Sequence, residues 1–402
     1  NVYDFTNLNE FNFSWVLLEN GKEVGSGTID NLDLEPYQSK IITLNVPILE
    51  NNTNDYHINI YVKTAEKQPL IPQGHMVAFE QFQLQKGSFN PVLATNGSPL
   101  KTAKNNADLS ISNNNINVVF DLKTGHLKSL DYGNGNIIVH GIQPNFWRAT
   151  TDNDFGFNMP KHFGIWKKAT EKQKLVSMFV KNKTATVDLL LEKDISLNGN
   201  TITLETSYRL PDDIAKIKME YTIDVSGQIT IKNSLLDVKK KLPNLPRFGT
   251  NFIINKAFNQ VNWYGRGPLE NYQDRKTSQF VGNYKASVSE LYFPYIRPQE
   301  NGYRTDVRWV TFTNNQGQGI KVLGPKYIGF SAHHQYNSDF DAGKTKQQRH
   351  TIDIKERDFV NINIDNELMG IGGDTSWWTR PLDEYQIKAK NQSFSYSIIP
   401  VE

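Results

Sequence analysis

Residues 1 to 93 alternate apolar and polar positions with the period of two that is typical of half-buried β-strands. Phe11, Phe13 and Trp15 fall on one face of such a strand, and Asn20-Gly21 provides a tight hairpin turn because both residues tolerate positive φ. Further strands are predicted at residues 1–5, 24–29, 41–46, 56–62 and 77–84. Short antiparallel strands at this spacing predict a small immunoglobulin-like β-sandwich.

The next segment, residues 94–107, reads ATNGSPLKTAKNNA. It is small and polar, and no apolar periodicity runs through it. This composition is typical of a linker, so a domain boundary is predicted here.

Residues 108–402 return to strand patterns, and helical periodicity is almost absent. Strands are predicted at residues 109–111, 116–122, 127–130, 185–191, 201–210, 216–225, 228–236, 247–254, 307–314, 319–323, 328–332, 359–365 and 394–399. Because each sheet must bury one face against a second layer, this region predicts a large antiparallel double-sheet sandwich. The fold class is therefore all-β.

Composition narrows the class of function. The formal charge of +2 favours neither nucleic acid nor an acidic membrane surface as a partner. No run of about 18 apolar residues is long enough to cross a membrane. The absence of cysteine excludes disulfides, thiolate zinc sites and a cysteine nucleophile. The chain begins without Met and is interpreted as a piece of a longer protein, so its localisation, cytoplasmic or periplasmic, stays open.

Three dense segments stand out from the strand pattern, and the longest is Trp263 to Trp309. It holds ten aromatic residues among several prolines and glycines, which excludes a helix, and a disordered linker would not carry so many aromatic rings. A long, ordered, irregular segment remains. Such a segment is either a structural cover over a β core or a functional loop.

The second segment runs from Phe146 to Asp154 and contains Asp152-Asn153-Asp154. Three such side chains in a row favour a loop, because they compete with the backbone for hydrogen bonds. One interpretation is a polar loop held by Arg148 pairing with an aspartate. The other is an oxygen-ligated cation, but no further ligands are evident, so no metal site is assigned.

The third segment, Met369 to Trp378, places two adjacent tryptophans after a glycine-rich stretch. Neighbouring side chains diverge, so at least one of Trp377 and Trp378 is expected to be displayed. A displayed indole is a suitable platform for the apolar face of a sugar. By the same divergence, the adjacent His333 and His334 are unsuited to binding one metal ion and are expected in the core or a turn.

The first segment resembles the C-terminal domain of the large β-galactosidases of glycoside hydrolase family 2. The family motif Trp-x-Gly-x-Gly-Pro-x-Glu-Asn-Tyr-x-Asp-Arg is matched by Trp263, Gly265, Gly267, Pro268, Glu270, Asn271, Tyr272, Asp274 and Arg275. A later Tyr-x-x-Pro-x-Glu-Asn-Gly-x-Arg motif is matched by Tyr295, Pro298, Glu300, Asn301, Gly302 and Arg304. The resemblance covers about residues 108 to 402 and implies a supersandwich similar to galactose mutarotase. The first domain resembles the family's preceding immunoglobulin-like domain more weakly.

The resemblance also implies roles for the other two segments. A similar Phe-x-Arg-Ala-x-x-Asp-Asn-Asp element in the family leads into a mobile loop beside the sugar site, here residues 155–166, with Gly156 and Gly164 as hinges. A similar Met-Gly-x-Gly-Gly-Asp-x-Ser-Trp element presents a tryptophan to the substrate, which by position is Trp377. The expected substrate-binding residues are Trp377, Trp378, Asp374, Arg148, Asp152, Asn153 and Asp154.

The catalytic groups of the family are not expected in this chain. Retaining glycoside hydrolysis needs two carboxylates about 5 to 5.5 Å apart, and the family carries them on a preceding α/β barrel that also holds magnesium and sodium. No βα alternation occurs here, so no catalytic residue, metal site or cofactor is assigned, and Glu270 and Glu300 are interpreted as structural. The chain alone is predicted to be inactive.

The resemblance therefore predicts the C-terminal piece of a retaining β-galactosidase acting on terminal β-galactosides. Its expected partners are a β-galactoside or other carbohydrate, the enzyme's own N-terminal and barrel domains, and further copies in a homo-oligomer. Two alternatives remain. One is an aldose 1-epimerase-like enzyme that uses His333 or His334 with Glu300 as acid and base. The other is a free carbohydrate-binding module that uses Trp377 and Trp378.

Overall fold

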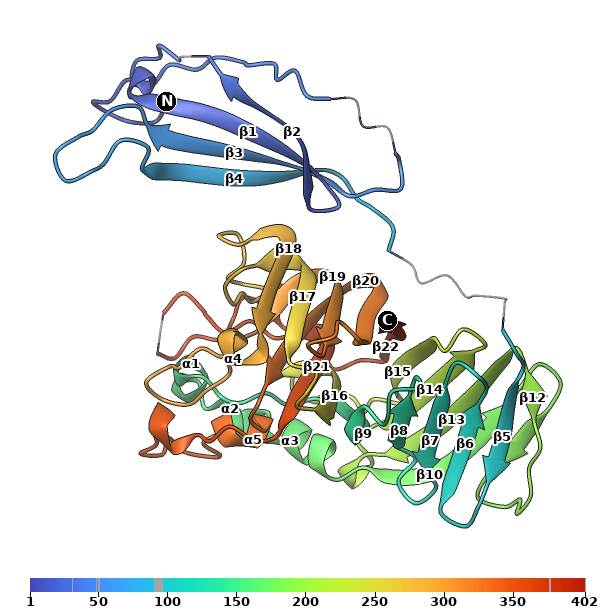
Figure 1. Cartoon of the computed structure of the whole chain (residues 1–402). Coiled ribbons are helices and arrows are strands. Elements are labelled where there is room, and N and C mark those ends of the chain that lie inside the picture. Colours follow the sequence, from blue (N-terminus) through green and yellow to red (C-terminus); the bar gives the residue numbers. More distant parts are fainter. Residues whose placement is uncertain (31, 48, 50, 90–96, 376, 402) are drawn as a thin grey trace. The chain divides into compact units, whose positions relative to one another are not determined.

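The computed structural model describes residues 1–402 except 31, 48, 50, 90–96, 376 and 402. The chain divides into two compact units, of which the first comprises residues 1–88 with 280–283 and the second comprises residues 89–279 with 284–402. Antiparallel strands dominate both units (Figure 1), which confirms the predicted all-β class.

The first unit is built around one sheet with the strand order β2-β1-β3-β4. Trp15, Leu17, Tyr56 and Ile58 form its core, because the period of two places these side chains on the same face of the paired strands. The described elements of this unit are η1 (Leu8–Glu10), β1 (Phe11–Glu19), β2 (Lys22–Ile29), β3 (Tyr56–Thr64) and β4 (Met76–Gln85).

Two strands predicted in the first unit are not formed. Residues 1–5 and 41–46 have no strand hydrogen bonding. Leu44 and Val46 nevertheless pack against the core formed by Trp15 and its neighbours. The apolar alternation of residues 41–46 therefore arises from side chains that cover the sheet. It does not indicate a paired strand.

The remaining elements belong to the second unit, except that the first four residues of β18 (Phe280–Ser287) are part of the first unit. The strands of the second unit up to the middle of the chain are β5 (Leu100–Lys104), β6 (Asp108–Ser112), β7 (Asn117–Asp121), β8 (Leu127–Asp131), β9 (Ile138–Asn145), β10 (Lys174–Lys181), β11 (Thr186–Asp188), β12 (Asn198–Gly199), β13 (Thr201–Arg209), β14 (Lys216–Asp224) and β15 (Ile229–Leu236). The later strands are β16 (Arg247–Asn255), β17 (Gln260–Gly267), β18 (Phe280–Ser287), β19 (Arg304–Thr313), β20 (Gly319–His333), β21 (Phe359–Leu368) and β22 (Gln392–Val401). The helices are α1 (Asp152–Gly156), α2 (Met159–His162), α3 (Gly164–Glu171), α4 (Val288–Leu291), α5 (Asn337–Phe340), η2 (Pro211–Asp213), η3 (Thr351–Asp353) and η4 (Asp383–Tyr385).

The predicted linker extended too far. Leu100–Lys104 lies within residues 94–107 but forms strand β5, which pairs with β6. Leu100 is fully buried in the core. Strand β5 presents only one large apolar side chain to the interior, and the residues around Leu100 are small or polar. The sequence therefore lacked the apolar alternation that predicts a strand.

The second unit is a sandwich of two sheets over one continuous core. The smaller sheet has the order β12-β5-β6-β7-β8, and the larger begins β11-β10-β13-β14-β15-β22. Phe120 on β7 meets Tyr221 on β14 with ring centroids 5.1 Å apart. Alternate residues of both sheets are buried in this layer, as expected for two sheets that cover each other's apolar faces.

Strand β20 joins the larger sheet to a branch that carries much of the site. Its first half pairs with β19 and β22, whereas Gly329 to His333 pair with β21. β21 in turn pairs with β16, and β16 pairs with β9. The helices α1 to α5 gather at this end of the unit (Figure 1).

The segment 155–166, expected as a mobile loop, is largely helical. Thr151 and Asp154 form a capping box that begins α1, and Trp166 on α3 is fully buried. Trp166 also donates a hydrogen bond from Nε1 to the carbonyl of Pro243 at 2.9 Å. Capping and burial therefore fix a backbone whose glycines and short polar residues suggested a loop. Among the described residues, no helix is long and apolar enough to span a membrane.

Candidate functional site

The backbone of the glycine-rich stretch Met369–Gly373 is the point where the three dense sequence segments meet. The carbonyl of Gly370 accepts a hydrogen bond from Arg148 Nη2 at 3.2 Å. The amide of Gly372 donates to the carboxylate of Asp274 at 2.7 Å. A side chain at position 370 would collide with that carboxylate, so glycine is required for this close approach.

Arg148 is held by Asp154 in the interior of the unit. Its Nη1 contacts Asp154 Oδ2, and its Nη2 lies 3.1 Å from Asp154 Oδ1. Both side chains are buried. The structure thus agrees with the interpretation that Arg148 pairs with an aspartate, and a buried bidentate pair of this kind positions the arginine rigidly.

The two neighbours of Asp154 differ in their surroundings. Asn153 donates from Nδ2 to the carbonyl of Ile371 at 3.1 Å, which adds a further link to the glycine-rich stretch. Asp152 is half-exposed and lies near Arg297 Nε at 3.4 Å and Lys346 Nζ at 3.1 Å. Cationic side chains contact both aspartates, so the geometry favours ion pairing over the oxygen-ligated cation as the interpretation of this segment. The described residues contain no group of three or more His, Asp or Glu side chains suited to holding one.

A cleft of about 300 Å³ lies beside this meeting point. Among the residues that line it are Asn153, Asp274, Arg275 and Asp374, together with the larger side chain of Tyr385. Amide, carboxylate and guanidinium groups around one concavity offer both donors and acceptors to hydroxyl groups. The cleft is therefore chemically suited to a polyhydroxylated ligand.

Both tryptophans of the third segment are displayed. Trp377 and Trp378 each expose 66% of their surface. The main chain at Trp377 packs closely on α1, where a Cβ at Gly156 would overlap the Trp377 carbonyl oxygen. The expected substrate-binding residues thus divide into two kinds. Trp377, Trp378 and Asp374 are exposed, whereas Arg148 and Asp154 support the loop from inside.

Asp274 and Arg275 line the cleft but were not singled out as substrate-binding residues from the sequence. They belong to the first motif, whose other polar residues are structural. Glu270 accepts hydrogen bonds from the amide of Gly302 at 2.7 Å and from Arg275 at 2.6 Å. Asp274 and Arg275 come directly after Glu270, Asn271 and Tyr272 in the motif, and this position was the available signal. Only the folded chain shows that Asp274 lies beside Gly372.

Glu300 and the histidines have surroundings that are ill-suited to acid–base catalysis. Glu300 is buried and lies 3.3 Å from Arg247, and burial raises its pKa against the effect of that arginine. Burial lowers the pKa of His333 to about 3, so its imidazole is neutral at physiological pH. His333 and His334 are buried and engage Asn301 Oδ1 and the carbonyl of Phe359. Their expected place in the core is confirmed.

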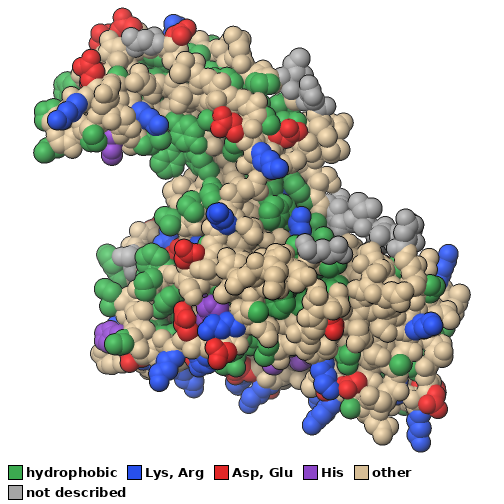
Figure 2. All heavy atoms as spheres, in the orientation of Figure 1, with side chains coloured by type: hydrophobic (Ala, Val, Ile, Leu, Met, Phe, Trp, Pro, Cys, Tyr) green, Lys and Arg blue, Asp and Glu red, His purple; other side chains and the backbone are tan. Residues whose placement is uncertain are grey.

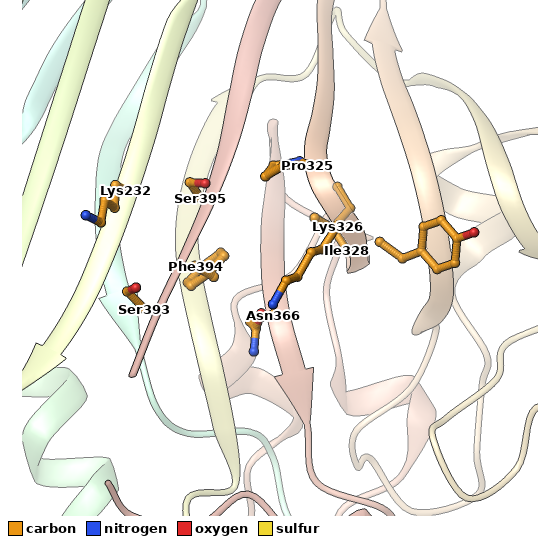
Figure 3. Close-up of a pocket in the computed structure, with 9 residues that line it drawn as sticks. Lys232, Pro325, Lys326, Ile328, Asn366, Ser393, Phe394 and Ser395 are labelled. Carbon is orange, nitrogen blue, oxygen red and sulfur yellow. The ribbon is translucent and has the colours of Figure 1, made fainter. Parts of the chain in front are cut away.

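A further cavity, of about 230 Å³, lies over β15, β22 and β20 (Figure 3). Lys232, Lys326, Asn366, Ser393 and Ser395 face it, but none of the expected site residues does. Of its two aromatic residues, Phe394 packs against Phe248 and Tyr396 in the core, and the ring of Tyr327 lies under the guanidinium of Arg308. On the face of the molecule in Figure 2, acidic and basic side chains are interspersed, consistent with the near-neutral charge.

The fold and the cleft at Asp274 define an all-β protein with a polar concavity, and two exposed tryptophans that do not line the concavity follow Asp374 in the chain. The family model described as "Beta galactosidase small chain" matches residues 112–398, and "Beta-galactosidase, domain 4" matches residues 1–85. The chain belongs to the β-galactosidase small-chain family. This confirms the resemblance to the C-terminal domains of β-galactosidases.

Curated relatives named β-galactosidase match most of the length of this chain. A β-galactosidase from Priestia megaterium is 31% identical over 397 residues, which is 98% of this chain and 36% of the relative. A β-galactosidase from Halalkalibacterium halodurans is 30% identical over 341 residues, 84% of this chain and 32% of the relative. The chain thus spans about a third of the length of these relatives.

Solved structures with a related outline include two sugar epimerases. A putative aldose 1-epimerase from Escherichia coli K12 is 7% identical, with a TM-score of 0.34, over 72% of this chain and 97% of that one. A galactose 1-epimerase from Lactobacillus acidophilus is 8% identical, with a TM-score of 0.33, over 77% of this chain and 99% of that one.

Proposed function

We propose that this chain forms the C-terminal part of a retaining β-galactosidase of glycoside hydrolase family 2, which hydrolyses terminal β-D-galactosides. In this proposal, the chain completes one wall of the sugar site and contributes contacts to a homo-oligomer. The catalytic carboxylates, magnesium and sodium belong to an α/β barrel that this chain does not contain. The relatives named β-galactosidase support the substrate class.

One observation carries the proposal. The three segments that resemble the family converge on the Gly370–Gly373 backbone and leave Trp377 and Trp378 exposed. Exposed apolar rings do not stabilise the fold. Stability alone therefore gives no reason for displaying them on a loop that buried ionic groups hold in place. The rings are suited to stacking on the apolar face of a galactose ring, and Asp374 in the same segment lines the polar cleft.

The test uses the intact enzyme. Stacking on an indole that removes on the order of 60 to 100 Å² from water contributes roughly 1.5 to 2.5 kcal/mol. Trp377→Ala should therefore raise KM by about ten- to seventyfold. Because stacking is similar in the ground and transition states, kcat should change less. Trp378→Ala is the matched control, since its indole is equally exposed.

Three outcomes are decisive. A rise in KM with Trp377→Ala alone supports the assignment of Trp377, and a rise with Trp378→Ala alone transfers the role to its neighbour. Unchanged KM values in both variants would remove this loop from the substrate site. Separately, the purified chain should not hydrolyse a chromogenic β-galactoside. Turnover that is abolished by mutating one of the chain's own carboxylates would overturn the assignment of catalysis to an absent barrel.

A further inference from the structure

We propose that the second unit carries another saccharide site, a cleft on the sheet branch β9-β16-β21-β20 that accepts one neutral sugar ring. The cleft has a volume of about 190 Å³ and shares no lining residue with the cleft at Asp274. It is smaller than the roughly 300 to 1,000 Å³ of sites for drug-sized ligands. A single ring fits this volume, and the inference does not depend on the proposed β-galactosidase activity.

A row of polar side chains crosses the floor of this branch. In the strand register, Asn251 lies opposite both Gln143 and Asn363, and Asn363 lies opposite Ser331. The intervening residues, including Ile362 and Ile364, point into the core on the other face. Asparagine is disfavoured in strands, so Asn251 and Asn363 in one row are not explained by sheet formation.

The amides are pre-organised by one another. Asn251 donates from Nδ2 to Asn361 Oδ1 at 2.7 Å and to Asn363 Oδ1 at 3.1 Å. Asn363 donates to Ser331 Oγ at 3.0 Å, and Asn337 on α5 donates to Asn363 Oδ1 at 3.0 Å. A buried network satisfied in this way fixes side-chain directions. It therefore presents a rigid polar surface to the cleft.

Hydrogen-bonding capacity remains on the cleft wall. Among the described residues, the amide of Gln143, the Oδ1 of Asn251 and the hydroxyl of Ser338 have no hydrogen-bond partner within the protein. Lys167 uses one N–H group on Asp341 at 2.8 Å and retains others. Donors and acceptors are thus interspersed around one small cavity, as a ring of hydroxyl groups requires.

Aromatic groups and charge define the ligand class. Trp147 lines the cleft and is oriented by a hydrogen bond from Nε1 to Asp341 Oδ2 at 2.7 Å, and the partly exposed Tyr336 lies at its edge. Asp341 neutralises Lys167, and Glu171 adds a second carboxylate to the lining, so the cleft offers no unpaired cation for a phosphate. A neutral, hydroxyl-rich ring with an apolar face matches these groups better than an anion does.

The test is a titration of the purified chain with D-galactose and with D-glucose, followed by calorimetry or by NMR shifts. One ring makes few contacts, so we expect a dissociation constant in the millimolar range, which corresponds to a binding free energy of about −4 kcal/mol. Gln143→Ala removes a side chain without a protein partner and should weaken binding by roughly three- to tenfold. Ser338→Ala should act in the same direction, and circular dichroism verifies that both variants are folded.

The double variant Trp377→Ala/Trp378→Ala is the control for the other cleft and should leave this binding unchanged. Binding that survives both Gln143→Ala and Ser338→Ala but disappears in the tryptophan double variant would overturn the proposal. Absence of saturable binding for both sugars would also overturn it. Tighter binding of glucose 6-phosphate than of glucose would contradict the neutral ligand class.

Discussion

Arg148 and Asp154 are joined in the interior of the second unit by two contacts between guanidinium and carboxylate, and Arg148 also reaches the carbonyl of Gly370. One buried ion pair thus connects the start of α1 to the glycine-rich stretch before Trp377. Both side chains are almost completely removed from solvent. The stability of this pair is therefore linked to the geometry of the displayed loop.

Asp154→Asn should destabilise the chain strongly, because it leaves the Arg148 charge buried without its counterion. Breaking a buried pair in this way costs roughly 3 to 5 kcal/mol. Asp152→Asn is the matched control, since Asp152 is half-exposed and pairs with surface cations. It should cost about 1 kcal/mol or less. Urea unfolding of both variants measures the difference, and equal effects would contradict the structural role of Asp154.

Trp377→Ala and Trp378→Ala should leave the stability of the chain nearly unchanged. Both indoles are largely exposed, and surface substitutions typically change the unfolding free energy by about 0.5 kcal/mol or less. Trp263→Ala provides the contrast, because Trp263 is buried against Tyr284 and Phe330. Its loss should cost about 3 to 5 kcal/mol. A large loss of thermal stability in the Trp377 variant would identify its ring as a packing residue.

Gly156→Ala should displace the main chain at Trp377. A Cβ at this position would overlap the Trp377 carbonyl oxygen, and backbone cannot yield as a flexible side chain does. Gly164→Ala is the control, since a Cβ there meets nothing within 4 Å and alanine favours the helix α3. Changed tryptophan fluorescence and faster proteolysis are expected for the first variant only. Identical behaviour of the two variants would refute this close packing.

Asp365 predicts a pH dependence of stability. Burial raises its pKa from 3.8 to about 7, although Arg247 lies 3.3 Å away. A raised pKa in the folded state stabilises the protein below the unfolded pKa, and this contribution is lost as pH rises through about 7. Wild type should therefore lose stability relative to Asp365→Asn between about pH 4 and 7.

The comparison with the variant is needed because His333 has the opposite effect. Its pKa is lowered by burial to about 3, so its contribution is lost as pH falls below 6.5. Taking the difference between wild type and Asp365→Asn at each pH removes that background. A difference that is constant from acid to neutral pH would contradict the raised pKa of Asp365.

The strand pattern of the second unit was only partly predictable from sequence, because β9, β10, β17 and β18 were not predicted. The alternation at residues 201–210 and 216–225 predicted β13 and β14 to within a residue. In both strands, the buried side chains contribute to one core, so local pattern and tertiary environment agree. The helices α1 to α3 were missed, because capping by Thr151 and burial of Trp166 override the glycines in that segment.

The candidate site was predictable only in part. The pairing of Arg148 with an aspartate and the display of a tryptophan followed from residue types and adjacency. The hydrogen bond from Gly372 to Asp274 joins residues 98 positions apart, and no local pattern specifies such a contact. Likewise, the amide floor around Asn251 depends on strand register, which sets residues from β9, β16, β21 and β20 side by side.

The way in which the glycine-rich stretch is held has a consequence for protein engineering. Arg148 and Asp274 form hydrogen bonds with main-chain atoms of Gly370 and Gly372. These bonds therefore do not depend on the identity of the side chains that follow. A library that varies Asp374 and positions 375 to 378 would keep its two anchor points. Under the substrate role proposed above for this loop, changing this short stretch alone should alter the specificity for a sugar or aglycone, without redesign of the sandwich beneath it.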